Sequence, residues 1–161
     1  MIDKLTLAGT YNAKIFAGIM LPEDEYLHSV RVAVVARAPD VLDDPGEHVS
    51  NAVVAVALLH DVVERYIDNR ARDEARAAIK RGFGNAVSEA VDLLTRPGDM
   101  TYRDYINRIY NSGNKVAASV KLADLQDHLD PVRVGNLPES MVKRYTDAQQ
   151  TLSFVDLEGW I

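Results

Sequence analysis

The chain has 161 residues, which is enough for one domain with a sizeable core and few for two domains. Hydrophobic residues make up 47% and charged residues 26%, which argues against a disordered chain, and an aromatic content of 7% disfavours an all-β design. The net charge of −6 disfavours a binder of duplex nucleic acid, and the lack of cysteine excludes disulfides, thiolate metal sites and cysteine nucleophiles.

The sequence contains no recognisable targeting or membrane segment. Its first six residues, MIDKLT, lack the apolar core of a signal peptide, and no apolar run approaches the ~20 residues of a membrane span. A chain without cysteine also suits a reducing compartment. We therefore expect a cytoplasmic protein with no membrane partner. A homo-oligomer stays open, and Trp160 is the only hint of an interface.

Two helices are expected in the first quarter of the chain. The first covers about residues 3–17. The second starts at Pro22, because proline suits the first helical position and the acidic residues 23–25 complement the helix dipole. His28 falls early in this second helix.

A third helix is expected over about residues 48–66, after a break marked by Pro39 and by the Asp-Asp-Pro-Gly sequence at 43–46. Residues 52–59 are almost wholly apolar, so this helix is hydrophobic all round. Such a helix is buried, which predicts that it lies at the centre of the fold.

The remainder of the chain predicts more helices, separated by glycine and proline. They cover about residues 68–80, 85–95, 102–110, 115–129 and 139–154. Gly82 fits a left-handed cap after the first of them, and Thr101 with Asp104 resembles a capping pair. No segment has the alternation of a strand, so the predicted fold is an all-α, single-domain helical bundle.

Ionisable residues interrupt the most apolar segments. His60 and Asp61 follow the run 52–59, Asp124 ends the sequence Lys-Leu-Ala-Asp, and His28 stands on a third helix. Such groups are costly to bury without a charged partner, and a divalent metal would supply one. A single buried histidine is more often a hydrogen-bonded core residue. The combination nevertheless gives the mixed nitrogen and oxygen ligands that hard-to-borderline metals accept.

Glu64 is a candidate to act beside such a metal. It follows His60 by four residues and Asp61 by three, so a continuous helix would place all three on one face. Glu64 could then hold a water molecule without being a ligand. Asp127 and Asp130 are expected to be solvated, away from the metal.

The order His28, His60-Asp61, Asp124 resembles the metal-binding signature of the HD phosphohydrolase superfamily. Within it, five segments are similar to successive motifs of the alarmone hydrolases, the RelA/SpoT-type hydrolase domain and its small stand-alone relatives. They are residues 26–33 (YLHSVRVA), 57–64 (ALLHDVVE), 93–96 (LLTR), 102–106 (YRDYI) and 120–125 (VKLADL). The resemblance implies an HD-type bundle.

That resemblance also implies an activity. The reaction would be removal of the 3′-pyrophosphate from (p)ppGpp, dependent on Mn²⁺ or another divalent metal, giving GDP or GTP and pyrophosphate. His28, His60, Asp61 and Asp124 would bind the metal, which would activate a water molecule and polarise the phosphoryl group. Glu64 would orient or deprotonate that water.

Basic residues would bind the phosphate charge. Arg65, Arg96, Lys115 and Lys121 are candidates, although such side chains on helix surfaces are usually solvated. His128 stands where the alarmone hydrolases typically have an asparagine that touches the nucleotide. It could stack on a base, hydrogen-bond a ribose, cap a helix or face solvent.

Two departures from the family pattern leave other functions open. The hydrolases usually have Glu-Asp where this chain has Glu64-Arg65, so a second carboxylate is missing. With His128 in the nucleotide pocket, the substrate could instead be a deoxynucleotide or a nucleoside monophosphate. A catalytically weak nucleotide-binding module is the third possibility, suggested by Arg65.

Overall fold

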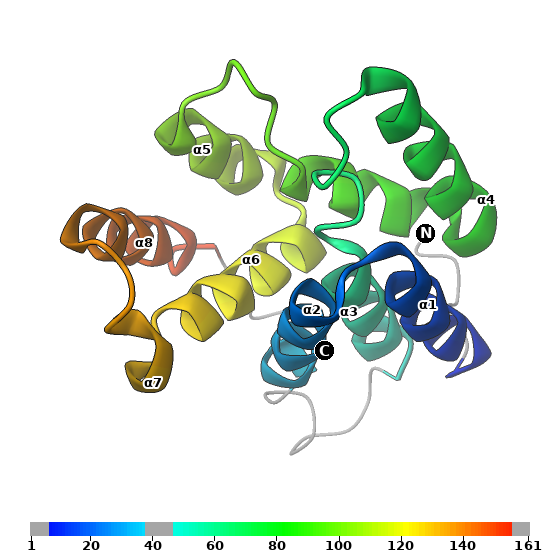
Figure 1. Cartoon of the computed structure of the whole chain (residues 1–161), viewed down its shortest axis with the longest axis horizontal. Coiled ribbons are helices and arrows are strands. Elements are labelled where there is room, and N and C mark those ends of the chain that lie inside the picture. The colour runs from blue at the N-terminus through cyan, green and yellow to red at the C-terminus, as the bar shows by residue number, and fades with distance from the viewer. Residues whose placement is uncertain (1–6, 38–46, 156–161) are drawn as a thin grey trace.

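The structure is a computed structural model that describes residues 7–37 and 47–155. These residues form helices and no strand, which confirms the predicted all-α fold (Figure 1). The predicted start of the first helix, the breaks at Pro39 and 43–46, and Trp160 lie outside the described residues. The helices are α1 (Leu7–Met20), α2 (Glu23–Arg37), α3 (Glu47–Leu59), α4 (Asn69–Leu94), α5 (Tyr102–Ser112), α6 (Lys115–His128), α7 (Pro131–Val134) and α8 (Glu139–Leu152).

Local sequence signals set several helix ends. The Thr101 hydroxyl accepts a hydrogen bond from the Asp104 backbone N–H at 3.1 Å and donates one to the Asp104 carboxylate at 2.6 Å. This confirms the predicted capping pair at the start of α5. Gly113 ends α5 in the left-handed conformation with φ 65°, and the Asn114 side chain caps α6 by accepting from the Ala117 N–H at 2.9 Å.

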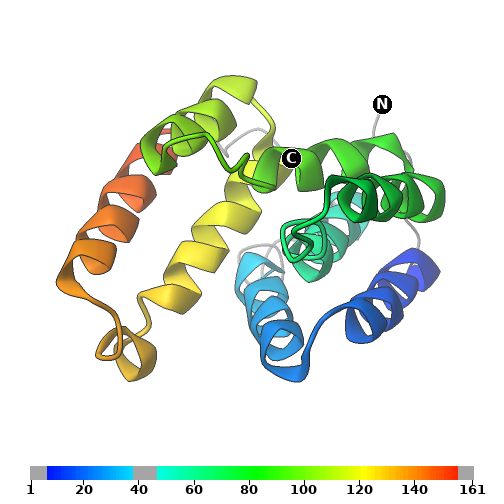
Figure 2. The same ribbon diagram turned by 45° about the horizontal axis from the view of Figure 1, so that its top comes forward.

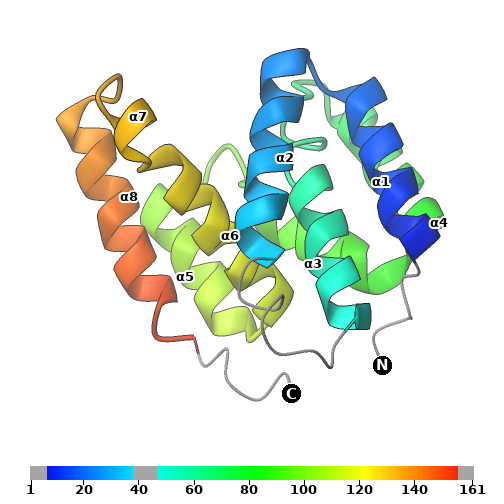
Figure 3. The ribbon, with the colours of Figure 1, turned by 90° about the horizontal axis from the view of Figure 1, so that it is seen from below.

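Helix α6 lies between two groups of helices. Views from different sides place α1 to α4 on one side of it and α5, α7 and α8 on the other (Figures 2 and 3). Within the first group α3 packs against both α1 and α2. Seven of the eight residues in the apolar run 52–59 are buried, which confirms that the third helix is central. No helix in the described ranges is long and apolar enough to cross a bilayer.

The third helix is shorter than predicted. It ends at Leu59, and the chain continues through turns instead of remaining helical to residue 66. In the first turn the Val62 N–H donates to the Leu59 carbonyl at 3.1 Å. The turns bury Val62 and Val63 completely, so tertiary packing overrides the continuous apolar pattern. His60, Asp61 and Glu64 therefore do not share one helical face.

The predicted helices 68–80 and 85–95 are two arms of α4, joined at a kink. Gly84 forms this kink with φ 84° and ψ 176°, a conformation that only glycine adopts readily. Gly82, the predicted cap, lies inside the helix, so that prediction was wrong by two residues. The kink lets both arms bury apolar residues, with Ile79 on one side of it and Val87 on the other.

We expect Gly84→Ala to lower the free energy of unfolding by about 1–3 kcal/mol, because a Cβ strains this backbone conformation. Gly82→Ala is the matched control. A Cβ at Gly82 meets nothing within 4 Å, and alanine favours the helix, so its effect should be neutral or stabilising by up to about 1 kcal/mol. Urea denaturation followed by circular dichroism measures both. Equal effects would contradict the assigned kink.

Candidate metal centre

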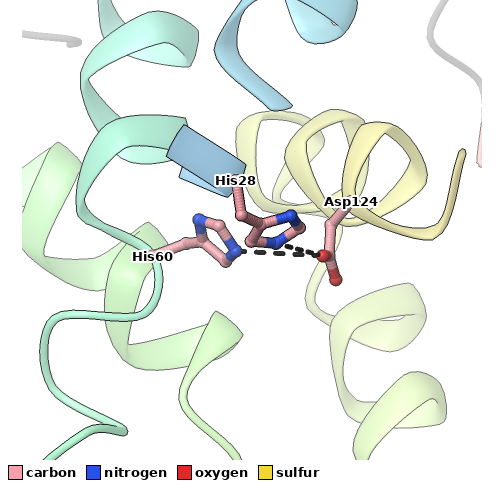
Figure 4. A group of neighbouring side chains, drawn as sticks. All are labelled: His28, His60 and Asp124. Carbon is pink, nitrogen blue, oxygen red and sulfur yellow. Dashed lines mark ion pairs between the residues drawn. The ribbon is translucent and has the colours of Figure 1, made fainter. Parts of the chain in front are cut away.

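Three elements that are distant in sequence bring two histidines and an aspartate together. His28 comes from α2, His60 from the turn after α3, and Asp124 from α6, and their side chains point toward one another (Figure 4). The Asp124 Oδ1 atom lies 3.1 Å from His28 Nε2 and 3.9 Å from His60 Nε2. All three ligand atoms lie within 4.8 Å of one another, so the group could hold a metal ion.

His60 presents a lone pair to this group. Its Nδ1 lies 2.7 Å from the Ala57 carbonyl oxygen, which only accepts, so Nδ1 carries the proton. Nε2 of the neutral ring is then an acceptor. It is buried and has no hydrogen-bond partner among the described residues. Since buried polar atoms are nearly always satisfied, this nitrogen is suited to a cation.

His28 is oriented in the same way, by a carboxylate. Its Nδ1 donates to Asp127 Oδ2 at 2.9 Å, which leaves Nε2 facing Asp124. Burial alone would lower the pKa of His28, but Asp124 and Asp127 more than offset this and raise it. A divalent cation would take the place of the proton on Nε2.

Asp127 fixes His28, contrary to the expectation that it is solvated. It is buried, with 3% of its side chain exposed, and accepts from Arg31 at 2.9 and 3.1 Å and from Arg133 at 2.8 Å. Burial alone would raise the pKa of Asp127, but the hydrogen bonds from Arg31 and His28 lower it. One sequence signal could have found this residue: it follows Asp124 by three positions, on the same helical face.

Asp124 uses its two oxygens differently. Oδ2 pairs with Lys121 Nζ at 2.7 Å, whereas Oδ1 faces the histidines. Burial alone would raise the pKa of Asp124, but the Lys121 ammonium and the hydrogen bonds from His128 and His28 hold it well below its ordinary value. The carboxylate is therefore ionised and can offer Oδ1 to a cation.

Two of the predicted side chains stand at the edge of the group. Asp61 Oδ2 lies 3.2 Å from His60 Nε2 and 3.8 Å from His28 Nε2. Its side chain is more exposed than that of Asp124, at 32% against 5%. His128 Nε2 lies 3.2 Å from Asp124 Oδ1, whereas Lys121 pairs with the other oxygen of Asp124. Asp61 thus lies beside the three residues that could hold a metal ion.

Glu64 lies within electrostatic reach of the centre although the turns place it differently from a helix. Its side chain is exposed, yet surrounding protein and the Asp61 charge raise its pKa, and Lys121 and Arg96 oppose this rise. Its neighbour Arg65 pairs with Glu25 of α2 at 3.7 Å. Glu64 is therefore coupled electrostatically to the charges around the centre, whereas Arg65 is paired with α2.

The basic residues predicted to bind phosphate differ in their partners. Lys121 is committed to Asp124, and its Nζ lies 5.3 Å from the centre of the Tyr105 ring. Arg96 donates to the Met100 carbonyl at 3.4 Å and forms no ion pair within the described part of the chain. Arg96 is the freer of these two charges. Lys115 begins α6, at the end that is capped by Asn114.

No protein-family model and no curated protein matches this chain. The site must therefore be judged by its own geometry. That geometry offers two imidazole nitrogens and one carboxylate oxygen, and each of these three side chains is held by a second hydrogen bond or ion pair. Such outer partners are what fixes ligands around a bound metal.

We expect Asp61→Ala to weaken Mn²⁺ binding by about a hundredfold or more, since loss of a ligand should exceed the effect of an outer partner. Isothermal titration calorimetry measures this. Asp73→Ala removes an exposed aspartate of α4 and should bind as the unchanged protein does. Undiminished Mn²⁺ affinity in Asp61→Ala would remove Asp61 from the ligand set.

We expect Asp127→Asn to weaken Mn²⁺ binding by about ten- to a hundredfold, because the charged partner that orients His28 is lost. The same titration measures it, and Asp73→Asn is its control. Since Arg31 and Arg133 also lose their partner, thermal unfolding should be recorded in parallel. Full affinity in a folded Asp127→Asn protein would show that His28 needs no orientation from Asp127.

Proposed function

We propose that this protein is a metal-dependent nucleotide phosphohydrolase of the HD type, which removes the 3′-pyrophosphate from (p)ppGpp. One observation carries the proposal: the buried Nε2 of His60 has no hydrogen-bond partner among the described residues, and it faces the carboxylates of Asp61 and Asp124 beside His28. A mixed set of imidazole and carboxylate ligands suits Mn²⁺. The sequence motifs shared with the alarmone hydrolases support the substrate.

The proposed ligands are His28, His60, Asp61 and Asp124. A divalent ion held by them would lower the pKa of a bound water and polarise the phosphoryl group. The protein's own part is to hold each ligand in one orientation. The Ala57 carbonyl does so for His60, and Lys121 does so for Asp124.

Glu64 is the proposed general base. The surrounding protein and, after it, the Asp61 charge raise the pKa of Glu64, and a carboxylate with a raised pKa is a better proton acceptor. Its exposed side chain is free to reach a water molecule at the metal. The oxygen of the attacking water would bond to phosphorus as its proton passes to a Glu64 carboxylate oxygen. The bond from the ribose 3′ oxygen to phosphorus would break, and that oxygen would take up a proton from solvent.

The cations near Glu64 would balance the charge of the pyrophosphate. Arg96 is the first candidate because none of its described neighbours forms an ion pair with it. Lys121 would attract the phosphate electrostatically while it remains paired with Asp124. Arg65 shares its charge with Glu25 across 3.7 Å, an exposed pair that a phosphate could displace. His128 would contact the nucleotide.

A second candidate keeps the reaction class but changes the nucleotide. His128 stands 3.2 Å from Asp124 Oδ1, and its ring centre lies 4.9 Å from that of His28. This imidazole at the edge of the metal ligands favours a deoxynucleotide or a nucleoside monophosphate as the alternative substrate. The third possibility, a catalytically weak binding module, is supported by Arg65. This residue stands in the place of a second acid and pairs with α2. Either function would place the protein in the cytoplasm, together with the nucleotides on which it acts or which it binds.

The test is release of pyrophosphate from ppGpp by the purified protein with Mn²⁺. We expect release that EDTA abolishes, and a kcat about 10²- to 10⁴-fold lower in Glu64→Gln with Mn²⁺ still bound. Glu74→Gln, which alters an exposed glutamate of α4, is the matched control and should keep full activity.

Three outcomes would count against the proposal in different ways. Release that persists in EDTA would remove the metal from the mechanism. Full activity in Glu64→Gln would remove Glu64 as the base. Bound Mn²⁺ without release from ppGpp, but with release of phosphate from a deoxynucleotide or nucleoside monophosphate, would favour the second candidate.

A further inference from the structure

A cavity lies between α5 and α8, and none of the proposed metal ligands is among its described lining residues. It has a volume of about 620 Å³. Three arginines line it: Arg96 before α5, Arg103 on α5 and Arg144 on α8. We call this cavity the arginine cleft. Asn107 and Thr151 add neutral polar groups to its wall.

Among the described lining residues of the arginine cleft, arginines outnumber acidic residues. Within the described ranges none of its three arginines forms an ion pair, whereas Arg70 and Arg76 on α4 both do. The only acid in the lining, Asp147, already pairs with Lys143 at 3.2 Å. In a chain of net charge −6, such a concentration of unpaired guanidinium groups is suited to an anionic ligand.

Tyr102 contributes its ring to the lining of the arginine cleft. Its hydroxyl is shielded from solvent and has no hydrogen-bond partner within the described part of the chain. Buried hydroxyls nearly always have a partner. The Arg144 guanidinium lies 5.6 Å from the centre of the Tyr102 ring, so this ring and an arginine belong to one wall of the cleft.

A row of rings connects the arginine cleft with the metal centre. From Tyr102 the ring centres follow at 5.9 Å to Tyr145, 5.2 Å to His128 and 4.9 Å to His28. Lys121, which pairs with Asp124, lies 5.8 Å from the centre of the same Tyr102 ring. The two sites are therefore neighbours, and one elongated ligand could occupy both.

We propose that the arginine cleft binds the second phosphate group of the substrate, the one that is not cleaved. This inference rests on the proposed function, and it defines the substrate as a nucleotide that carries phosphates at two separate positions. Arg103 and Arg144 would select that second group by charge-assisted hydrogen bonds. A nucleotide with a single phosphate group would fill only one of the two sites.

The first experiment measures binding alone, with GDP as the probe and EDTA present so that no metal contributes. GDP carries a diphosphate but no 3′-pyrophosphate. We expect the double variant Arg103→Gln/Arg144→Gln to bind GDP about tenfold more weakly or worse, and guanosine no differently. Arg70→Gln/Arg81→Gln makes the same change of charge on α4 and should leave GDP binding unchanged.

The second experiment measures turnover of ppGpp by the same variants. Loss of the second phosphate contact should raise KM about tenfold and leave kcat unchanged, because the cleft binds ground state and transition state equally. Arg103→Lys/Arg144→Lys should recover part of the affinity. Thermal unfolding verifies that each variant folds, and both arginines are exposed.

The two experiments separate this inference from the proposed function. No GDP binding, or binding that the double glutamine variant does not weaken, would overturn the arginine cleft even if ppGpp is hydrolysed. Weakened GDP binding in that variant, with no hydrolysis of ppGpp, would support the cleft as a phosphate site and reject the assigned reaction.

Discussion

A buried negative charge organises this molecule. Asp124 projects from α6, the helix that packs between the two groups of helices, and only 5% of its side chain is exposed. Burial of a carboxylate is tolerated only where cations and hydrogen-bond donors surround it. Lys121 satisfies one oxygen, and the imidazoles of His28 and His128 approach the other. The packing of α2 and of the turn after α3 onto α6 is therefore tied to this carboxylate.

The surroundings of Asp124 show how orientation is achieved by the fold. Asp127, one turn further along α6, links His28 of α2 to Arg133 of α7. His60 is held by a carbonyl within its own turn. Both rings consequently present Nε2 to the same oxygen without moving, which is the preorganisation that a metal ligand set requires. The ending of α3 at Leu59 makes this possible, because a turn can aim His60 independently of the helix.

Acidic and basic side chains gather in different regions of the molecule, which the net charge of the chain does not reveal. Acidic groups gather around the histidines, whereas arginines without ion pairs among the described residues gather in the arginine cleft. Lys121 and the Tyr102 ring stand between these regions. A cation and an anion can thus be bound at neighbouring positions, and opposite fields at two adjacent sites suit a ligand that carries several phosphates together with a metal.

The sequence by itself determined the all-helical fold, the Thr101–Asp104 cap and the central place of the third helix, because these follow from periodicity, capping chemistry and local hydrophobicity. It also selected His28, His60 and Asp124 as groups too polar for their surroundings. Tertiary structure decided that α3 stops at Leu59, that Gly84 forms the kink, and that Asp127 pairs with His28 of α2. Those features depend on contacts between residues as many as 99 positions apart, and such contacts leave no period in the chain.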